Sequence, residues 1–139
     1  MRISRTDLDA ILRHARSGHP FEVCGVLLGR NGGIVDGVVT VANRETEAPR
    51  VRYQIAPEDL LRIQREARET GREVLGFYHS HPDHPARPSE TDRRIAAEGL
   101  SDGVVHMVVS VEQGERATPT AWVFHDATQG FEEVALEVD

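Results

Sequence analysis

The chain has 139 residues, a length that fits a single domain over residues 1–139 with its own hydrophobic core. Its hydrophobic share of 39% and charged share of 28% are typical of a globular protein and exclude a disordered chain. The 16 basic and 23 acidic residues give a net charge of −7, which disfavours a nucleic-acid partner, although Arg93 and Arg94 could still cluster locally. No apolar stretch approaches the roughly 20 residues of a membrane span, and the first residues lack the apolar core of a signal peptide. We therefore expect a cytoplasmic protein with no membrane partner.

The spacing of hydrophobic residues predicts helices and strands along the whole chain. In chain order they are a helix at 5–17, strands at 22–30 and 34–42 joined by a hairpin turn at Asn31-Gly32-Gly33, a strand at 50–55, a helix from Pro57 to Gly71, a strand at 74–81, a helix at 89–99, and strands at 104–111, 120–125 and 132–138. This order predicts an α/β (α+β) fold with a mixed, largely antiparallel sheet flanked by helices.

The most informative segment lies between residues 79 and 92. In an extended strand, residues two apart point to the same face, so His79 and His81 can present two ring nitrogens to one ion, while Ser80 faces away. A proline then ends the strand, and the following turn brings the next helix back over the histidines. Asp92, one turn into that helix, can point at the same ion. Two imidazoles and one carboxylate are the ligand set of an open catalytic zinc site, which leaves a fourth position for water.

The same residues also have simpler explanations. A pair of histidines two residues apart can lie in solvent near a strand end without binding a metal. Ser89 and Asp92 match a variant capping box at a helix N-terminus, a role that is compatible with metal binding. We expect His84, which follows a turn, to be solvated. Two histidines and a carboxylate would also suit iron or manganese.

Metal-assisted hydrolysis needs a group that takes a proton from the attacking water, and usually an oxyanion donor. Glu22 precedes the buried strand and is a candidate for the first role. An ordinary glutamate at a strand edge would explain the same position.

Together these residues resemble the motif of the JAMM (MPN-plus) metalloproteases. The matching pattern is His79-x-His81-Pro82, five residues, Pro88-Ser89, two residues and Asp92. Upstream, the segment Glu22-Val23-Cys24-Gly25-Val26-Leu27-Leu28-Gly29 is similar to the glutamate-bearing strand of that family. The resemblance covers most of the chain and implies the JAMM/MPN (cytidine-deaminase-like) fold of a small, single-domain prokaryotic-type member.

The resemblance implies a zinc-dependent peptidase or isopeptidase. His79, His81 and Asp92 would hold one zinc ion, and a zinc-activated water would attack the scissile bond. Glu22 would act as general base and then return the proton to the leaving amine, while Ser89 would stabilise the oxyanion. The implied substrate is a ubiquitin-like protein cut after its C-terminal Gly-Gly, and for small prokaryotic members a ubiquitin-fold sulfur carrier. Both a monomer and a homodimer are compatible with the sequence.

The sequence leaves two other functions open. A non-catalytic MPN-type binding module would share the fold, but it predicts the loss of Glu22 or of a ligand, and all of them are present. A DNA-repair-type or phage-tail-type relative is the other alternative. The first usually carries an N-terminal helical module and the second a fused peptidoglycan hydrolase, and we expect neither here.

Overall fold

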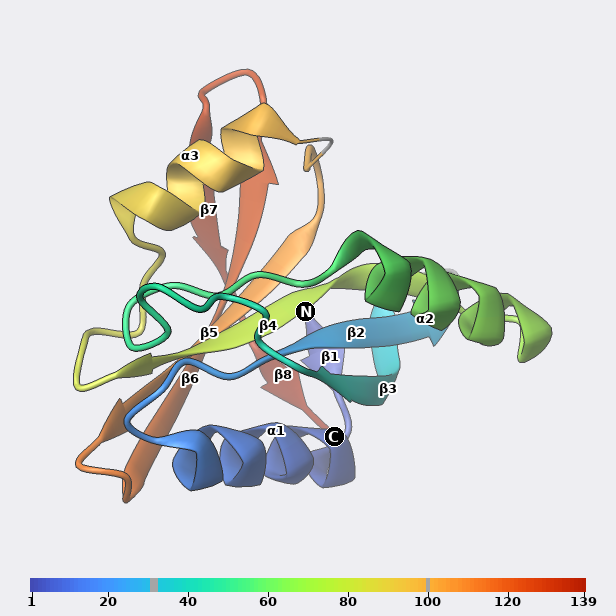
Figure 1. Ribbon diagram of the computed structural model, residues 1–139. Coiled ribbons are helices and arrows are strands. Elements are labelled where there is room, and N and C mark those ends of the chain that lie inside the picture. The colour runs from blue at the N-terminus through green and yellow to red at the C-terminus, as the bar shows by residue number, and fades with distance from the viewer. Residues whose placement is uncertain (31–32, 100) are drawn as a thin grey trace.

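One curled sheet organises the part of the chain that the structure, a computed structural model, describes: residues 1–30, 33–99 and 101–139 (Figure 1). The elements are β1 (Arg2–Ile3), α1 (Arg5–Gly18), β2 (Cys24–Arg30), β3 (Ile34–Val41), α2 (Pro57–Glu69), β4 (Glu73–Pro82), α3 (Glu90–Glu98), β5 (Val105–Glu112), β6 (Arg116–His125), β7 (Gly130–Val134) and β8 (Glu137–Val138). The eight strands follow the order β7-β6-β5-β4-β2-β3-β1-β8. Strand β4 runs parallel to β5, and β1 runs parallel to β3 and β8, while the other neighbours are antiparallel. The predicted mixed, largely antiparallel sheet flanked by helices is confirmed.

The sheet curls because its two edge strands are nearly continuous in sequence. Only residues 135 and 136 separate β7 from β8, although these strands are at opposite ends of the strand order. Helix α1 packs inside the curl, where Leu8, Ile11 and Ala15 contact buried side chains of β2 to β5. Helix α2 covers the other side of β2, where Ile63 and Ala67 contact a second buried cluster (Figure 1). Strand β2 is therefore buried on both faces, as its continuous apolar run predicts.

Local signals at the helix starts agree with the predicted boundaries. The Ser4 hydroxyl accepts a hydrogen bond from the Asp7 N–H at 3.1 Å and caps α1. Pro57 occupies the first turn of α2, where its missing N–H costs nothing. None of the helices in the described ranges is long and apolar enough to cross a membrane.

The predicted strand at 50–55 is wrong. Among the residues that the structure describes, this segment has no strand partner, and it lies in the connection between β3 and α2, here called the strap (residues 43–55). The alternation holds at its C-terminal end, since Tyr53 and Ile55 pack against the α2 cluster while Gln54 between them is exposed. Its backbone is held instead by Asn43, whose Oδ1 accepts hydrogen bonds from the N–H groups of Glu45 and Gln54, each at 3.0 Å. An alternating pattern indicates which side chains are buried, but it does not show what the backbone bonds to. Here the Asn43 side chain accepts backbone hydrogen bonds that a neighbouring strand would accept in a sheet.

Two C-terminal elements also differ from the prediction. The segment 132–138 forms two strands at opposite edges of the sheet instead of one strand. Strand β6 begins at Arg116 and so includes Pro119, which is tolerated because pairing with β7 starts only at Ala121. The short strand β1 was not predicted. Of the predicted hairpin turn, Asn31 and Gly32 lie outside the described residues.

A close approach between β2 and β4 requires glycine at position 25. Gly25 pairs with Tyr78 across these strands, and a Cβ at Gly25 would lie 2.1 Å from Cε1 of the tyrosine ring. The Tyr78 side chain is buried, and its hydroxyl lies 2.8 Å from Nδ1 of His14 on α1. The ring thus fills the space that a side chain at position 25 would need.

We expect Gly25→Ala to lower the free energy of unfolding by about 1–3 kcal/mol, because the added methyl group overpacks the core against Tyr78. The matched control is Gly37→Ala in β3, where the nearest atom to the added Cβ is 3.7 Å away. That control should change the free energy by less than about 0.5 kcal/mol. Urea denaturation of both variants measures the difference, and equal effects would contradict the steric argument.

Candidate metal centre

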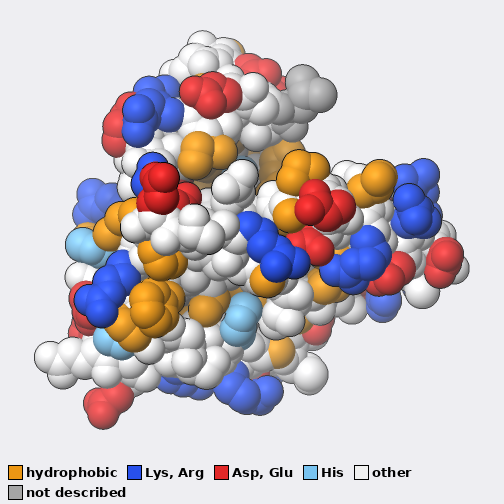
Figure 2. Space-filling view, viewed as in Figure 1, with side chains coloured by type: hydrophobic (Ala, Val, Ile, Leu, Met, Phe, Trp, Pro, Cys, Tyr) orange, Lys and Arg blue, Asp and Glu red, His pale blue; other side chains and the backbone are white. Residues whose placement is uncertain are grey.

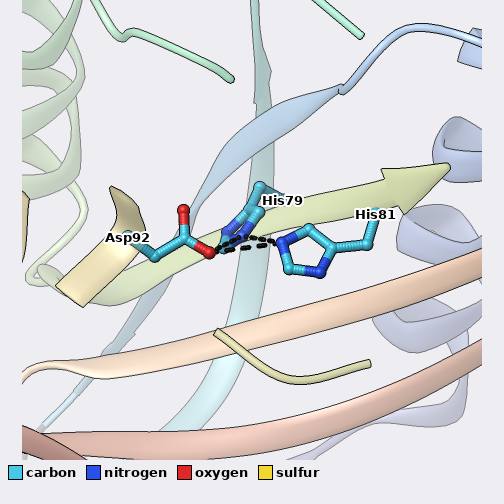
Figure 3. Close-up of side chains that lie close together, drawn as sticks. All are labelled: His79, His81 and Asp92. Carbon is cyan, nitrogen blue, oxygen red and sulfur yellow. Dashed lines mark hydrogen bonds and ion pairs between the residues drawn. The ribbon is translucent and has the colours of Figure 1, made fainter. Parts of the chain in front are cut away.

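Strand β4 presents two imidazoles on one face near its C-terminal end. His79 and His81 are only 2% and 6% exposed, and both rings point toward the start of α3 (Figure 3). Ser80 lies between them and is fully buried on the other face, where its hydroxyl accepts a hydrogen bond from the Val23 N–H at 2.9 Å. The period of the strand therefore brings the two imidazoles together, as the spacing in the sequence predicts.

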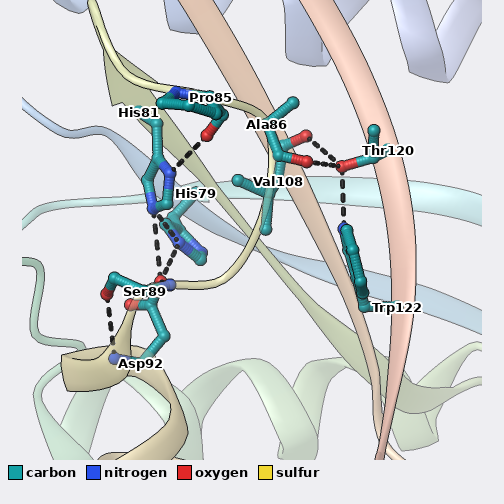
Figure 4. A network of polar contacts seen from close by, with 9 residues as sticks. All are labelled: His79, His81, Pro85, Ala86, Ser89, Asp92, Val108, Thr120 and Trp122. Atoms are coloured by element: carbon teal, nitrogen blue, oxygen red, sulfur yellow. Dashed lines mark hydrogen bonds and ion pairs between the residues drawn. The ribbon is translucent and has the colours of Figure 1, made fainter. Parts of the chain in front are cut away.

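The turn after β4 is held firmly against the sheet. The carboxylate of Asp83 accepts a hydrogen bond from the Gln113 N–H at 2.7 Å. Further along, the Thr120 hydroxyl lies 2.6 Å from the Ala86 carbonyl oxygen, and Nε1 of Trp122 donates to that hydroxyl at 2.8 Å (Figure 4). These contacts fix the path that returns the chain over the imidazoles.

Helix α3 begins with a capping box that also orients a carboxylate toward the histidines. The Ser89 hydroxyl accepts a hydrogen bond from the Asp92 N–H at 3.1 Å, and Oδ2 of Asp92 accepts one from the Ser89 N–H at 2.8 Å. The same Oδ2 atom faces both imidazoles (Figure 4). Asp92 therefore caps the helix and faces the two histidines at once, so the capping role does not compete with the predicted ligand role.

Three potential ligand atoms form a nearly equilateral triangle. Nε2 of His79 lies 3.1 Å from Nε2 of His81 and 3.1 Å from Oδ2 of Asp92, and the remaining side measures 3.2 Å (Figure 3). Ligands of a tetrahedral zinc ion, bound at about 2.0–2.1 Å, lie roughly 3.3–3.4 Å apart. The triangle is within a few tenths of an ångström of that spacing, so these residues fit a zinc ion, and they are the one such group of ligands among the described residues.

The surroundings of the two imidazoles hold their ring orientations. Nδ1 of His81 lies 2.9 Å from the Pro85 carbonyl oxygen; as the donor to this acceptor, it leaves the Nε2 lone pair free for a metal. The ring of His79 stacks on Tyr53 of the strap, with centroids 4.6 Å apart and an interplanar angle of 22°. Within the described residues, Nδ1 of His79 is buried without a hydrogen-bond partner.

Burial and mutual contact shift the pKa values of this cluster in opposite directions. Burial lowers the pKa of His79, and the nearby Asp92 only partly opposes that effect. Burial also acts to lower the pKa of His81, but hydrogen bonds to Asp92 and to the Pro85 carbonyl outweigh it and raise the value. For Asp92, burial acts to raise the pKa, but the hydrogen bonds with the two imidazoles hold it far below its usual range. The carboxylate is thus ionised and available as a metal ligand.

Glu22 lies beside this triangle as a buried carboxylate. Its side chain is 5% exposed, and Oε1 has no hydrogen-bond partner within the described residues. Burial, the largest cause, raises the pKa of Glu22 to about 8. Its backbone is fixed by the strap, since its N–H donates to the Pro49 carbonyl at 2.8 Å and its carbonyl accepts from Nδ2 of Asn43 at 3.0 Å. A carboxyl group with a raised pKa in a cavity is suited to exchange protons.

Two cavities adjoin the triangle, and Arg52 and Thr91 line both of them. The first, of about 660 Å³, contains Glu22 and Ser89 beside His81; we call it the Glu22 cavity. The second, of about 570 Å³, lies on the side of His79 and Asp92; we call it the His79 cavity. Apolar side chains of β4, α2, α3 and the strap line much of the His79 cavity, namely Phe77, Leu60, Ile95, Tyr53 and Ile55. Figure 2 shows the surface hollowed between α3 and α2, with hydrophobic side chains inside.

Sequence reasoning missed the residues of the strap. Asn43 holds the backbones of Glu22 and Arg52, Tyr53 stacks on His79, and Arg52 lines both cavities. No motif marks these positions, because their contacts join segments that are distant in sequence. The expectation that His84 is solvated is confirmed, since its side chain is exposed at the rim of the Glu22 cavity.

Comparison with known proteins places the chain and its fold in one family. The model of the prokaryotic homologues of the JAB domain matches residues 4–125. A desampylase of Haloferax volcanii is 36% identical over 136 residues, which cover 94% of this chain and 91% of that protein. A CysO-cysteine peptidase of Mycobacterium tuberculosis is 34% identical over 98 residues, covering 69% of this chain and 66% of that protein. Among solved structures, a JAB1/MPN domain protein of Archaeoglobus fulgidus is 27% identical and superposes with a TM-score of 0.65, covering 99% of this chain and 98% of that one.

These matches define a JAB/MPN-type domain, the class to which the JAMM metalloproteases belong. The chain belongs to the family of prokaryotic homologues of the JAB domain. The predicted resemblance to this family, and with it the prediction of an enzyme of the JAMM class, is confirmed.

We expect Asp92→Asn to weaken zinc retention strongly, because it replaces an anionic ligand atom while an amide oxygen can still accept the helix-capping hydrogen bond. Removing one of three ligands should leave little zinc after dialysis against a chelator. Glu90→Gln, an exposed change in the same helical turn, should retain the zinc of the unaltered protein. Metal content per chain by elemental analysis is the measurement, and equal content in both variants would exclude Asp92 as a ligand.

A pH-dependent loss of stability should follow from the burial of Glu22. In the metal-free protein the folded-state pKa of about 8 exceeds the ordinary value of 4.5, so the folded state binds the proton more tightly than the unfolded state. The stability that this proton provides is present at low pH and is lost as pH rises through the folded-state pKa. Metal-free protein should therefore lose stability between about pH 4.5 and about pH 8 relative to Glu22→Gln, whose side chain does not titrate. Parallel urea titrations of chelator-treated samples would reveal this difference, and identical pH profiles would refute it.

Proposed function

We propose that this protein is a zinc-dependent peptidase or isopeptidase that cleaves a ubiquitin-like protein after its C-terminal Gly-Gly, with a sulfur carrier as the substrate. The observation that carries the proposal is the buried carboxylate of Glu22 beside a triangle of three potential zinc ligands. The similarity to a desampylase and to a CysO-cysteine peptidase supports a ubiquitin-like substrate.

In this proposal His79, His81 and Asp92 hold one zinc ion. When bound, zinc acts as a Lewis acid that lowers the pKa of a water molecule to about 7 and polarises the scissile carbonyl. The two imidazoles and the carboxylate come from β4 and α3, two elements that the capping box and the turn after β4 hold in fixed positions. These residues thus need no rearrangement to bind the ion.

Glu22 and Ser89 act on the reacting groups. Glu22 takes one proton from the attacking water and passes it to the leaving nitrogen, a role suited to its raised pKa of about 8. The Ser89 hydroxyl already accepts a hydrogen bond from the Asp92 N–H, so its own proton is free to be donated to the oxyanion. Both residues line the same cavity as His81, which brings proton transfer and oxyanion stabilisation to one carbonyl.

The extended tail of the substrate occupies the His79 cavity. Its apolar lining suits aliphatic side chains of a flexible C-terminal tail, while the two glycines approach the metal without steric conflict. The alternative of a non-catalytic binding module offers no reason to bury a carboxylate without a partner, which costs free energy in any fold. The net charge of −7 gives no support to a DNA-repair function, because DNA binding relies on an excess of positive charge.

We expect Glu22→Gln to retain zinc but to hydrolyse substrate roughly 10²- to 10⁴-fold more slowly, because the amide cannot transfer a proton. The substrate is a ubiquitin-like sulfur carrier that continues beyond Gly-Gly, and mass spectrometry of the products locates the cut. Enzyme samples are compared at equal zinc content. Glu66→Gln, an exposed carboxylate of α2, serves as the matched control and should cleave at the rate of the unaltered enzyme.

A cut after the second glycine by the unaltered enzyme and the control alone would support the proposal. Full activity of Glu22→Gln would remove Glu22 from the mechanism. If zinc-loaded enzyme cut none of several sulfur-carrier fusions, the proposed substrate class would be wrong.

A further inference from the structure

The position of Glu22 determines on which side of the metal centre the leaving group lies. Hydrolysis breaks the bond between the carbonyl carbon and the nitrogen, and the oxygen of water forms a new bond to that carbon. The nitrogen leaves as an amine only after it receives a proton. Glu22 lines the first cavity and not the second, so a proton passed from its carboxyl group reaches a nitrogen in the Glu22 cavity.

This orientation assigns different parts of the substrate to the two cavities. The acyl chain, which ends in glycine, extends from the carbonyl away from the nitrogen and enters the His79 cavity. The leaving group enters the Glu22 cavity. The side chains of the Glu22 cavity therefore recognise what the enzyme releases.

The Glu22 cavity is electropositive although the chain as a whole is acidic. Its described lining includes two arginines, Arg52 and Arg87, while Glu22 is the one carboxylate. In a chain of net charge −7, this concentration of cations creates a local binding site for an anion.

The two arginines have free capacity to bind an anion. Arg87 is exposed and makes no ion pair with the residues that the structure describes. Arg52 forms ion pairs with Glu45 and Glu47 at 3.8 and 3.9 Å, but these distances exceed a hydrogen bond, so its N–H donors remain available. A guanidinium group presents paired donors that match a carboxylate, and the resulting charge-assisted bonds are stronger than neutral ones.

We propose that the leaving group carries a carboxylate next to the departing amine, as a free amino acid or a short C-terminal extension does, and that Arg87 and Arg52 bind this carboxylate. This inference rests on the proposed peptidase function and specifies what that enzyme releases. The ε-amine of a lysine in a folded protein has no carboxylate at that distance from the nitrogen. A cavity of about 660 Å³ accommodates an amino acid or a few residues without contact to a folded partner.

The test compares three substrates that share one ubiquitin-like sulfur carrier ending in Gly-Gly. The first carries a single C-terminal alanine with a free carboxylate, and the second carries the same alanine as its carboxamide. The third is joined through an isopeptide bond to the ε-amine of Nα-acetyl-lysine amide. We expect kcat/KM for the free carboxylate to exceed that for the carboxamide and for the isopeptide by roughly 10- to 100-fold, the contribution expected of hydrogen bonds to a charged group.

Charge-neutral variants locate the preference within the cavity. Arg87→Gln should reduce the ratio of acid to carboxamide cleavage at least severalfold, and the double variant with Arg52→Gln should bring it close to one. Arg65→Gln removes the same charge from the exposed face of α2 and should keep the full ratio. Dissociation constants of the acid and carboxamide substrates are also measured with zinc-loaded Glu22→Gln. Their ratio provides a readout that does not depend on turnover.

The outcomes separate this inference from the function on which it rests. Equal cleavage of acid and carboxamide by the unaltered enzyme would overturn the inference and leave the peptidase intact, as would faster cleavage of the isopeptide. A preference that survives in the double variant, or that disappears equally in Arg65→Gln, would overturn the role of the two arginines. If none of the three substrates were cut, the peptidase function and the inference would both fail.

Discussion

A single atom, Oδ2 of Asp92, joins helix α3 to strand β4. It accepts a hydrogen bond from the Ser89 N–H at 2.8 Å and lies 3.1 and 3.2 Å from the two imidazole nitrogens. The start of the helix and the end of the strand are therefore fixed by the same contact. The proposed oxyanion donor, the candidate ligands and the capping box all depend on this one position, and this explains why so short a segment of chain can build the centre.

The strap provides a second constraint, which acts from the opposite side. Asn43 donates to the carbonyl oxygens of Glu22 and Arg52, so the proposed general base and a cavity wall are attached to one side chain. Tyr53 of the same segment stacks on His79. The strap thus contacts both Glu22 and the candidate ligand His79, and its Arg52 lines both cavities. The site is assembled from three regions of the chain, and no one of them folds into a site alone.

How far the sequence predicts this site depends on the range of the contacts involved. The positions of His79, His81 and Asp92 follow from the period of a strand and the geometry of a helix start, both local rules that spacing alone reveals. No local pattern predicts the conformation of the strap. Its Tyr53 and Ile55 side chains pack against the α2 cluster, while the N–H groups of Glu45 and Gln54 donate hydrogen bonds to the Asn43 side chain. The division of 132–138 into β7 and β8 is equally hidden, since it depends on the curl of the whole sheet. Glu22 lay between these cases: its residue type fitted a base, but only its burial and its neighbours distinguish it from an ordinary strand-edge glutamate.

Ser80, the residue between the two histidines, has a consequence for any attempt to transplant this centre. Its N–H donates to the Val23 carbonyl, and its hydroxyl accepts from the Val23 N–H. Position 80 thus sets the register of β4 against the residue that follows Glu22, and the spacing between base and ligands is fixed by backbone pairing. The smallest part of the fold that would preserve this geometry is the strand pair β2 and β4 together with the start of α3. Grafting the three candidate ligand side chains onto another scaffold would carry over the triangle of ligand atoms but not its distance to the proposed base.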